Sequence, residues 1–459
     1  MDALISRLTA ALGPAAVLTE PHDIAPYGED WRGLYRNTPR AVLRPADTAG
    51  VAAAVALCAA AGIAIVPQGG NTSMVAGGIP SAPDAEIVLS LARLNRLRSL
   101  DRAGLTLVVE AGMTLRDAQL AAEAAGALLP LSISSEGSAQ IGGVIATNAG
   151  GNNTLRFGNA RDLVLGLEVV LPDGAIWHGL RGLRKDNTGY ALRHLFAGSE
   201  GTLGIITAAV LKLSPAPRER ATCLVGLASV AAVLDLFARF RDEDDAALYA
   251  FEYISGTAME INLRHMPDGR LPLGQSAAHY ALIELATTRR NAALRTTIEA
   301  VLGDALEAGL IEDAAIALSE AQRLAFWALR EHVSESQKRE GASIKNDVSV
   351  PVASVPALLD RAATMLAKTY PDARMAAFGH IGDGNIHLNV ITTADPAALM
   401  ADVNAIVADL GGSFSAEHGV GLVKRAAFGQ WRDETERGVM RRIKLALDPG
   451  AGMGPGKLF

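Results

Sequence analysis

Three long stretches of glycine and small polar residues constrain this chain more than any other feature. They cover residues 68–78, 132–151 and 198–204, and the first follows a strand predicted over residues 63–66. Glycine lets backbone N–H groups approach a ligand closely, and successive N–H groups form concave sites for anions. One such stretch alone would be an ordinary tight turn. Three in one region favour a loop cluster that binds a phosphate-bearing cofactor.

These stretches do not have the spacing of the best-known nucleotide-binding loops. The first is not Gly-x-Gly-x-x-Gly, and no clear βαβ unit with an acidic residue about twenty positions later follows it, which disfavours a Rossmann NAD site. The segment Gly454-Pro-Gly-Lys457 lacks the Ser or Thr that a Walker A motif needs after its lysine.

Charge and cysteine content exclude several classes of protein. The chain has 42 Lys and Arg against 49 Asp and Glu, a net charge of −7, with no long charge runs, which argues against a nucleic-acid partner. Cys58 and Cys223 stand in unrelated contexts, so neither a disulfide framework nor a thiolate zinc site is expected. No secretory signal is visible in the first residues, and we expect a cytoplasmic location.

Residues 49–67 contain no charge and have the length of a membrane span. They are mostly alanine, however, and Gly62 interrupts them. We therefore predict a helix, a glycine stop and a buried strand, with no stable membrane insertion.

The order of predicted elements changes after residue 217, where a Ser-Pro-Ala-Pro segment ends. From there the pattern predicts strand 222–227, helix 229–241, strand 247–254, strand 278–286, helix 291–309 and strand 311–317. This βαββαβ order is that of the ferredoxin-like motif. We predict domains over residues 1–217, 218–412 and 413–459, which suits a chain of 459 residues.

The segment Phe378–Asn389 reads as a β-hairpin. Its Asp383-Gly384 pair is preferred in two-residue type I′ turns, a loop that places His380 opposite His387 on one face. Asn389 joins that face because strand side chains alternate with period two. Two imidazoles and an amide suit a divalent metal. From these residues alone, a surface hairpin with incidental histidines is an equally good interpretation.

The glycine-rich stretches resemble the flavin-binding domain of the vanillyl-alcohol-oxidase, or PCMH-type, flavoproteins. The matching segments are Val66–Met74, Gly142–Gly151, Lys185–Tyr190 and Gly198–Gly204. The resemblance covers nearly the whole chain and narrows to the D-2-hydroxyglutarate dehydrogenase family, with D-lactate and glycolate dehydrogenases as relatives. It implies an α+β fold: a two-subdomain PCMH-type FAD-binding domain, a ferredoxin-like substrate (cap) domain, and a C-terminal helical segment returning to the flavin site.

In that family the loops surround the pyrophosphate and isoalloxazine of FAD. Members with covalent FAD often carry a histidine in or near the first loop; none lies between Val66 and Pro80, so non-covalent FAD is implied. The residues implied to contact FAD are Pro67, Gly69, Gly70, Asn71, Thr72, Ser134, Gly137, Ser138, Ile141, Gly142, Gly143, Ala146, Thr147, Asn148, Gly150, Gly204 and Ile206.

The resemblance also implies a divalent metal, usually zinc, bound by His380, His387 and Glu417. Three N or O ligands with an open position form a catalytic arrangement, and the metal would lower the pKa of a substrate hydroxyl. His418 would then contact the substrate as general base, a role that suits the ordinary histidine pKa of about 6.5.

Arg330, Ser334 and Lys345 match the pattern with which the family holds the carboxylates of D-2-hydroxyglutarate, and Asn389 would add a polar contact. Arg330 and Ser334 are four residues apart on a helix predicted over 319–340 and should share one face. Without the resemblance, a solvated helix face is the plainer interpretation of Arg330. The implied reaction is oxidation of D-2-hydroxyglutarate to 2-oxoglutarate, with hydride passing to flavin N5.

Several alternatives stay open at this point. D-lactate, glycolate or D-malate could be the substrate, and a flavin-free metal-dependent hydrolase or a non-enzymatic flavin subunit is a more distant possibility. The electron acceptor could be an electron-transfer flavoprotein, a quinone or oxygen, and the family suggests a homodimer. The chain also departs from the family's usual Leu-Asn-Pro-Gly-Lys, because Met453-Gly454 replaces Leu-Asn.

Overall fold

The computed structural model describes residues 3–458, which fall into two compact units. Unit 1 comprises Met1–Gly150, Gly158–Ala216 and Glu417–Phe459, and unit 2 comprises Gly151–Phe157 and Pro217–Ala416. The segment from Glu417 onward therefore belongs to unit 1. In sequence it is separated from the rest of unit 1 by Pro217–Ala416, which belong to unit 2.

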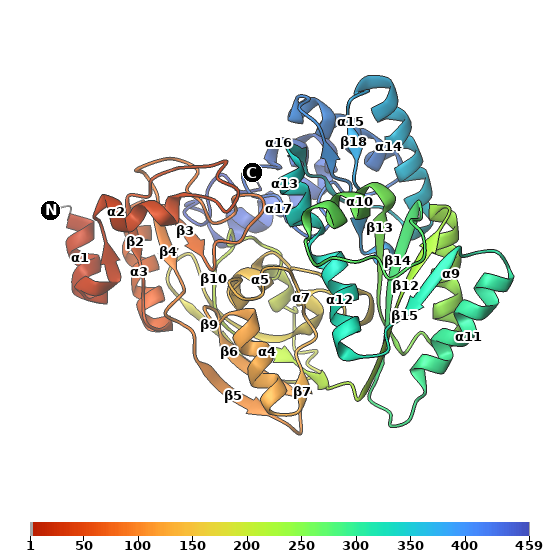
Figure 1. Ribbon diagram of the computed structural model, residues 1–459. Coiled ribbons are helices and arrows are strands. Elements are labelled where there is room, and N and C mark those ends of the chain that lie inside the picture. The colour runs from red at the N-terminus through yellow and green to blue at the C-terminus, as the bar shows by residue number, and fades with distance from the viewer. Residues whose placement is uncertain (1–2, 459) are drawn as a thin grey trace. The chain divides into compact units, whose positions relative to one another are not determined.

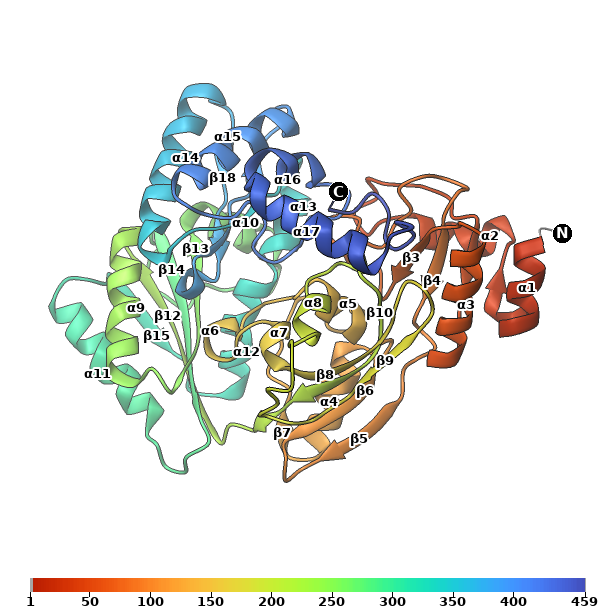
Figure 2. The same cartoon turned by 180° about the vertical axis from the view of Figure 1, so that it is seen from behind.

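Unit 1 contains a four-stranded sheet in the order β1-β2-β4-β3. Its strands are β1 (Val17–Leu18), β2 (Ala41–Leu43), β4 (Ile87–Ser90) and β3 (Ile65–Gln68). β2, β4 and β3 run parallel, and their continuous apolar runs are typical of strands covered on both faces. Helix α3 (Thr48–Ala60) connects β2 to β3, and α1 (Ala3–Leu12) packs against it (Figure 2).

The charge-free segment folds as predicted. Asp47 caps α3 by accepting a hydrogen bond from the Gly50 amide at 2.8 Å, Gly62 turns the chain with φ +65°, and β3 follows. Among the described residues, no helix combines the length and the apolar character needed to cross a membrane.

The second sheet of unit 1 is antiparallel, in the order β5-β6-β10-β8-β9. Its strands are β5 (Leu97–Asp101), β6 (Thr106–Glu110), β10 (Ile205–Lys212), β8 (Val164–Val170) and β9 (Ile176–Gly179). β5 is largely exposed and carries little apolar signal. The remaining elements of unit 1 are α2 (Pro21–Ile24), α4 (Leu115–Ala124), β7 (Ala127–Leu128), α5 (Ile141–Ala146), α7 (Ala160–Leu163), α8 (Arg193–Phe196), β11 (Ser214–Pro215), α16 (Arg425–Trp431) and α17 (Glu434–Leu447).

Unit 2 is built on a seven-stranded sheet in the order β15-β12-β14-β13-β19-β20-β17. Its strands are β15 (Asp313–Ile316), β12 (Glu219–Leu227), β14 (His279–Thr287), β13 (Leu248–Ser255), β19 (Phe378–Gly379), β20 (Asn385–His387) and β17 (Asp347–Ser349). The first four, with α9 (Val230–Asp244) and α11 (Leu294–Glu307), give the predicted βαββαβ motif. The Phe378–Asn389 segment extends this sheet beyond β13.

Helices cover both faces of this sheet (Figure 1). Cys223, Val225 and Phe251 pack under α9 and α11. The alternate residues, such as Leu224 and Ala250, pack under α10 (Gly256–His265) and α12 (Glu320–Glu331). The period-two alternation of strands thus produces two separate cores.

The other elements of unit 2 are α6 (Thr154–Phe157), α13 (Val333–Glu340), α14 (Val355–Thr369), α15 (Pro396–Asp409), η4 (Ile381–Asp383) and the small sheet β16-β21-β18, with β16 (Ser343–Ile344), β21 (Val390–Ile391) and β18 (Arg374–Met375).

Candidate functional site

The three glycine-rich stretches meet in unit 1. A Cβ on Gly70 would lie 1.8 Å from the carbonyl oxygen of Ser138, so the first stretch packs directly on the second. The amides of Gly198 and Glu200 donate to the carbonyls of Ile145 and Ala146 at 3.0 and 2.8 Å, which joins the third stretch to the second. Residues far apart in sequence therefore form one loop cluster, as a shared cofactor requires.

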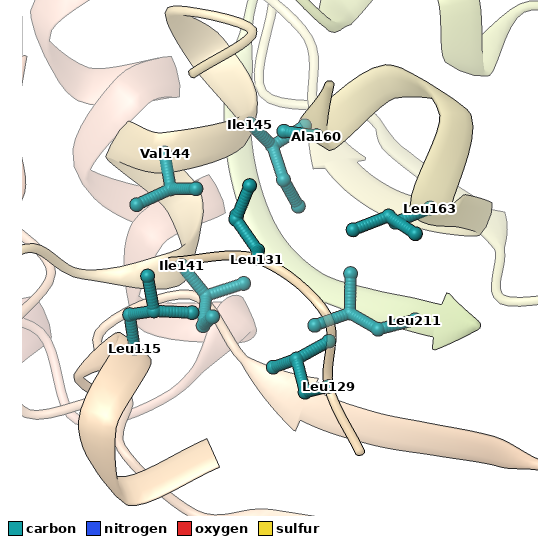
Figure 3. A pocket seen from close by; sticks show the side chains of 9 residues that line it. All are labelled: Leu115, Leu129, Leu131, Ile141, Val144, Ile145, Ala160, Leu163 and Leu211. Carbon is teal, nitrogen blue, oxygen red and sulfur yellow. The ribbon is translucent and has the colours of Figure 1, made fainter. Parts of the chain in front are cut away.

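Helix α5 places the second stretch. Its Ile141, Val144 and Ile145 side chains point into a small apolar cavity (Figure 3). The cavity is also lined by Leu115, Leu129, Leu131, Ala160, Leu163 and Leu211. Gly143 lies on the opposite side of the helix, where a Cβ would meet nothing within 4 Å. The apolar side of α5 is thus anchored in the core while its glycine side faces open space.

The loop cluster fits a flavin nucleotide on two observations. The Gln140 side-chain oxygen is buried and has no hydrogen-bond partner among residues 3–458, and it lies 3.6 Å from the Cβ position of Gly69. Gly143 beside it leaves room for a ligand at close range. A buried acceptor without a partner indicates a donor that binds there. The sequence patterns did not single out Gln140.

Several predicted cofactor residues support the loops themselves. The Asn71 amide donates to the Glu29 carbonyl, Asn148 accepts from the Arg161 amide, and the Thr147 hydroxyl donates to the Gly143 carbonyl. Both asparagines adopt left-handed φ, +53° and +51°. Gly204 and Ile206 stand at the start of β10, beside β8. The remaining predicted residues lie on the same stretches: Pro67, Gly69, Thr72, Ser134, Gly137, Ser138, Ile141, Gly142, Ala146 and Gly150.

The segment from Gly452 to Lys457 lies beside β3. The Ile65 amide donates to the Gly452 carbonyl, and the Gly454 amide donates to the Ile65 carbonyl, both at 2.8 Å. Gly454 has φ +53°, a conformation that glycine adopts without strain and asparagine tolerates best among the other residues. The replacement of the family's asparagine by Gly454 therefore preserves the backbone conformation.

Two charged side chains join the part of unit 1 after residue 416 to the loop cluster and its surroundings. Lys457 donates to the Ile79 carbonyl at 2.6 Å, and burial lowers the pKa of its amine to about 8 against the attraction of Glu86 and Glu200. Glu200 accepts from the amides of Val420 and Gly421 at 2.9 and 2.7 Å. Burial raises the pKa of Glu200.

The predicted register of the hairpin is wrong. Phe378, and not His380, pairs with His387 across β19 and β20, and η4 occupies residues between the strands. Instead of a two-residue turn, the chain here packs against the segment that follows β17. Gly384, at φ +81°, lies so close to β17 that a Cβ would stand 2.1 Å from the Val350 carbonyl oxygen. The two imidazoles still approach each other, with ring centroids 5.9 Å apart.

A buried carboxylate that the sequence patterns missed lies behind His380. Glu252 accepts from His380 Nδ1 at 2.7 Å and from Arg330 Nε at 2.7 Å. Burial raises the pKa of Glu252, but the attraction and hydrogen bonds of His380 and Arg330 outweigh it and hold that pKa below its ordinary range. A sequence signal existed: an acidic residue inside the apolar strand Leu248–Ser255 requires a buried partner.

Arg330 is buried, which excludes the solvated-face interpretation. Arg323, Trp327 and Arg330 form one stripe of α12 that faces the sheet, where the first two contact Glu284 and the third contacts Glu252. The Arg330 guanidinium carbon also lies 4.8 Å from the Phe378 ring centroid.

The other predicted substrate residues have different surroundings. The helix predicted over 319–340 breaks at His332, and Ser334 on α13 is exposed while Arg330 is buried. Asn389 follows β20, and its side-chain amide donates to Gln337 at 2.8 Å. Lys345 is half-buried between β16 and β17. The structure does not test the binding roles of these residues.

Glu417 and His418 stand where the chain passes from unit 2 to unit 1. Ala416, directly before them, donates to the Asp347 carbonyl at 3.3 Å, and Asp347 is the cross-strand partner of His387. Glu417 thus follows directly in sequence after a residue that is bonded to the strand beside the hairpin. Ligand atoms of His380, His387 and Glu417 all lie within 4.8 Å of one another, and the same is true of Asp347, Glu417 and His418. Imidazole and carboxylate donors of this kind suit a divalent metal.

Comparison with known proteins identifies two matching regions. The family described as FAD linked oxidases, C-terminal domain, matches residues 216–458. The family described as FAD binding domain matches residues 39–179.

Similar proteins of known name cover the whole chain. The D-2-hydroxyglutarate dehydrogenase of Xanthomonas citri pv. viticola is 38% identical over 100% of this chain and 97% of its own length. The mitochondrial D-2-hydroxyglutarate dehydrogenase of Bos taurus is 37% identical, covering 97% and 81%. The D-2-hydroxyglutarate–pyruvate transhydrogenase of Saccharomyces cerevisiae is 34% identical, covering 95% and 90%.

Solved structures share the fold at low identity. An alkyldihydroxyacetonephosphate synthase superposes with a TM-score of 0.76 at 17% identity, covering 100% of this chain and 85% of its own. A p-cresol methylhydroxylase with substrate bound superposes with a TM-score of 0.74 at 17% identity, covering 99% and 96%. These structures confirm the predicted α+β fold class.

Proposed function

This chain belongs to the PCMH-type family of FAD-linked oxidases and is an FAD-dependent D-2-hydroxy-acid dehydrogenase, and on that premise we propose that it oxidises D-2-hydroxyglutarate to 2-oxoglutarate with the help of a divalent metal. The observation that carries the proposal is one buried array in unit 2: the guanidinium of Arg330 is joined through Glu252 to His380, which stands beside His387. The same array thus contains a cation that could bind a carboxylate and two imidazoles that could bind a metal.

The residues of the loop cluster in unit 1, with Gln140 and Gly143 among them, would hold FAD non-covalently. Bound FAD supplies the oxidising group that accepts a hydride from the substrate Cα. His380, His387 and Glu417 would hold the metal, with zinc as the expected ion. A metal held there supplies Lewis acidity to the substrate hydroxyl.

The chain's own residues then have separate tasks. Arg330 binds a substrate carboxylate, for which its planar fork is suited, and Lys345 adds a second cation. His418 removes the hydroxyl proton as general base. Ser334 and Asn389 add polar contacts to the substrate.

One observation favours a second candidate within the same reaction class. The charge of Arg330 is already compensated by Glu252, which weakens the case for two cations dedicated to a dicarboxylate. D-lactate, glycolate or D-malate could then be the preferred acid. The flavin-free hydrolase is disfavoured by the match to the FAD binding domain.

Substrate-dependent bleaching of the flavin absorbance tests both candidates. The purified protein is mixed without oxygen with D- and L-2-hydroxyglutarate, D- and L-lactate, D-malate and glycolate. Bleaching that is fastest with D-2-hydroxyglutarate is expected; faster bleaching with a monocarboxylate would establish the second candidate. A colourless protein with no extractable flavin contradicts both. The electron acceptor, a homodimer and a cytoplasmic location stay predictions.

A further inference from the structure

We propose that Glu252 is a positioning residue that couples His380 to Arg330: it orients the imidazole toward the metal and turns one edge of the guanidinium toward the substrate. This inference rests on the proposed function, because it requires a metal at His380.

The sheet itself puts Glu252 in this place. β13 and β19 are antiparallel, with Tyr253 opposite Gly379 and Ile254 opposite Phe378, so Glu252 is next in register to His380. Directly opposed residues point to the same face of a sheet. Helix α12 covers that face and brings Arg330 to the second carboxylate oxygen. The three side chains are only 1%, 8% and 8% exposed, in the order Glu252, His380, Arg330.

The contact with Glu252 selects one nitrogen of His380 for the metal. With Nδ1 donating to the carboxylate at 2.7 Å, Nε2 is the nitrogen that coordinates. A carboxylate behind a ligating imidazole fixes its tautomer and orientation and raises its basicity.

The same contact limits how Arg330 can bind an acid. Its Nε donates to Glu252, and the Phe378 ring lies below its guanidinium carbon. A substrate carboxylate therefore meets the two terminal amino groups, the remaining edge of the fork. The Glu252 carboxylate thus fixes the position of His380, the metal ligand, relative to Arg330, the cation that binds the substrate.

The test compares Glu252→Gln with a matched control, Glu284→Gln. Glu284 is buried in the adjacent strand β14, and it accepts from Arg323 and the Trp327 indole; within residues 3–458 it has no hydrogen bond or ion pair with a histidine. Both substitutions preserve volume and remove one buried charge beside arginine. Glutamine at residue 252 can accept one of the two hydrogen bonds, while its NH₂ group faces the other donor.

The measurement is zinc affinity of the metal-stripped flavoprotein by competition with a chromophoric chelator. Flavin content, melting temperature, and KM and kcat for D-2-hydroxyglutarate are measured in parallel. For Glu252→Gln we expect zinc affinity about 10–100-fold weaker, together with a raised KM. For Glu284→Gln we expect a lower melting temperature and unchanged zinc affinity.

A wild-type protein that binds zinc, with a Glu252→Gln variant that binds it equally well, overturns the role of Glu252 alone. A wild-type protein that binds no zinc overturns the metal part of the proposed function as well. If Glu252→Gln does not fold, the neutral pair Glu252→Gln/Arg330→Gln is compared with Arg330→Gln alone. Equal zinc affinity in those two variants also contradicts the inference.

Discussion

The α-carbon of Gly70 packs against the carbonyl oxygen of Ser138, leaving no room for a side chain: a Cβ at residue 70 would stand 1.8 Å from that oxygen. Gly70→Ala must therefore displace backbone where the first two glycine-rich stretches meet. We expect about 1–3 kcal/mol of lost stability and a reduced flavin content, measured by urea unfolding and by absorbance of the purified protein. Gly450→Ala is the control, because a Cβ there meets nothing within 4 Å and residue 450 is not among the predicted FAD contacts. Equal flavin content in both variants would contradict the packing role of Gly70.

Gly143→Ala should separate folding from cofactor binding. Residue 143 lies within α5 and has open space around its Cβ position, so alanine should stabilise the flavin-free chain by about 0.5–1 kcal/mol. If FAD approaches that side of the helix, the added methyl group must weaken its binding. The measurements are the melting temperature of the flavin-free protein and the FAD dissociation constant by fluorescence quenching. Unchanged FAD affinity would remove Gly143 from the cofactor site.

His418→Ala should distinguish a general base from a metal ligand. If His418 is the base, kcat should fall about 10²–10⁴-fold while the metal content stays unchanged. Loss of the metal would instead indicate that the ion occupies Asp347, Glu417 and His418, the second group of possible ligands. His387→Ala, which removes a ligand of the first group, should lose metal and keep its flavin. His178→Ala, with a side chain 71% exposed in unit 1, should change neither metal content nor flavin content.

The stability of the protein around pH 9 should depend on Lys457. Burial lowers the pKa of its amine from 10.5 to about 8, so between these values the unfolded chain binds more protons than the folded chain. The free energy of unfolding of the wild-type protein, compared with that of Lys457→Met, should therefore increase as the pH rises from about 8 to 10.5. The increase is at most about 1.4 kcal/mol per pH unit. Urea unfolding of both proteins from about pH 7 to about pH 10 measures this difference. A difference that does not change with pH would contradict the prediction, and the exposed Lys185→Met provides the control.

Both cysteines should be unreactive in the folded protein. Burial raises the pKa of Cys58 to about 12, opposed by Arg40, and burial also raises the pKa of Cys223. Because the thiolate is the reactive form, neither should react quickly with a thiol reagent at neutral pH, and both should react after unfolding. A fast-reacting thiol in the native protein would contradict this.

The sequence predicted what depends on local pattern. Apolar alternation located β12, β13 and β14, and Gly62 marked the stop between α3 and β3. The hairpin register was wrong because the Asp383-Gly384 preference is local, whereas the Val350 carbonyl beside Gly384 comes from the residue after β17.

The partner of Glu252 was not predictable for a similar reason. Arg330 is 78 residues away in sequence, and only the packing of α12 on the sheet brings the two side chains together. The acidic residue in an apolar strand showed that a partner must exist but not which one. Gln140 was missed because nothing in a glycine-rich loop marks one amide as buried and unsatisfied.

The interrupted course of unit 1 has a consequence for synthesis on the ribosome. β3 is complete only when Gly452 and Gly454 pair with Ile65, and nearly all of unit 2 is translated in between. At about 5–20 residues per second, the 200 residues of Pro217–Ala416 occupy roughly 10–40 s. Unit 2 can fold during that time. The β3 edge of the parallel sheet, beside the glycine-rich loops, stays unpaired until Gly452 and Gly454 have been synthesised. An exposed strand edge is prone to pair with other chains, so we expect nascent chains of this protein to depend on chaperones most during this interval.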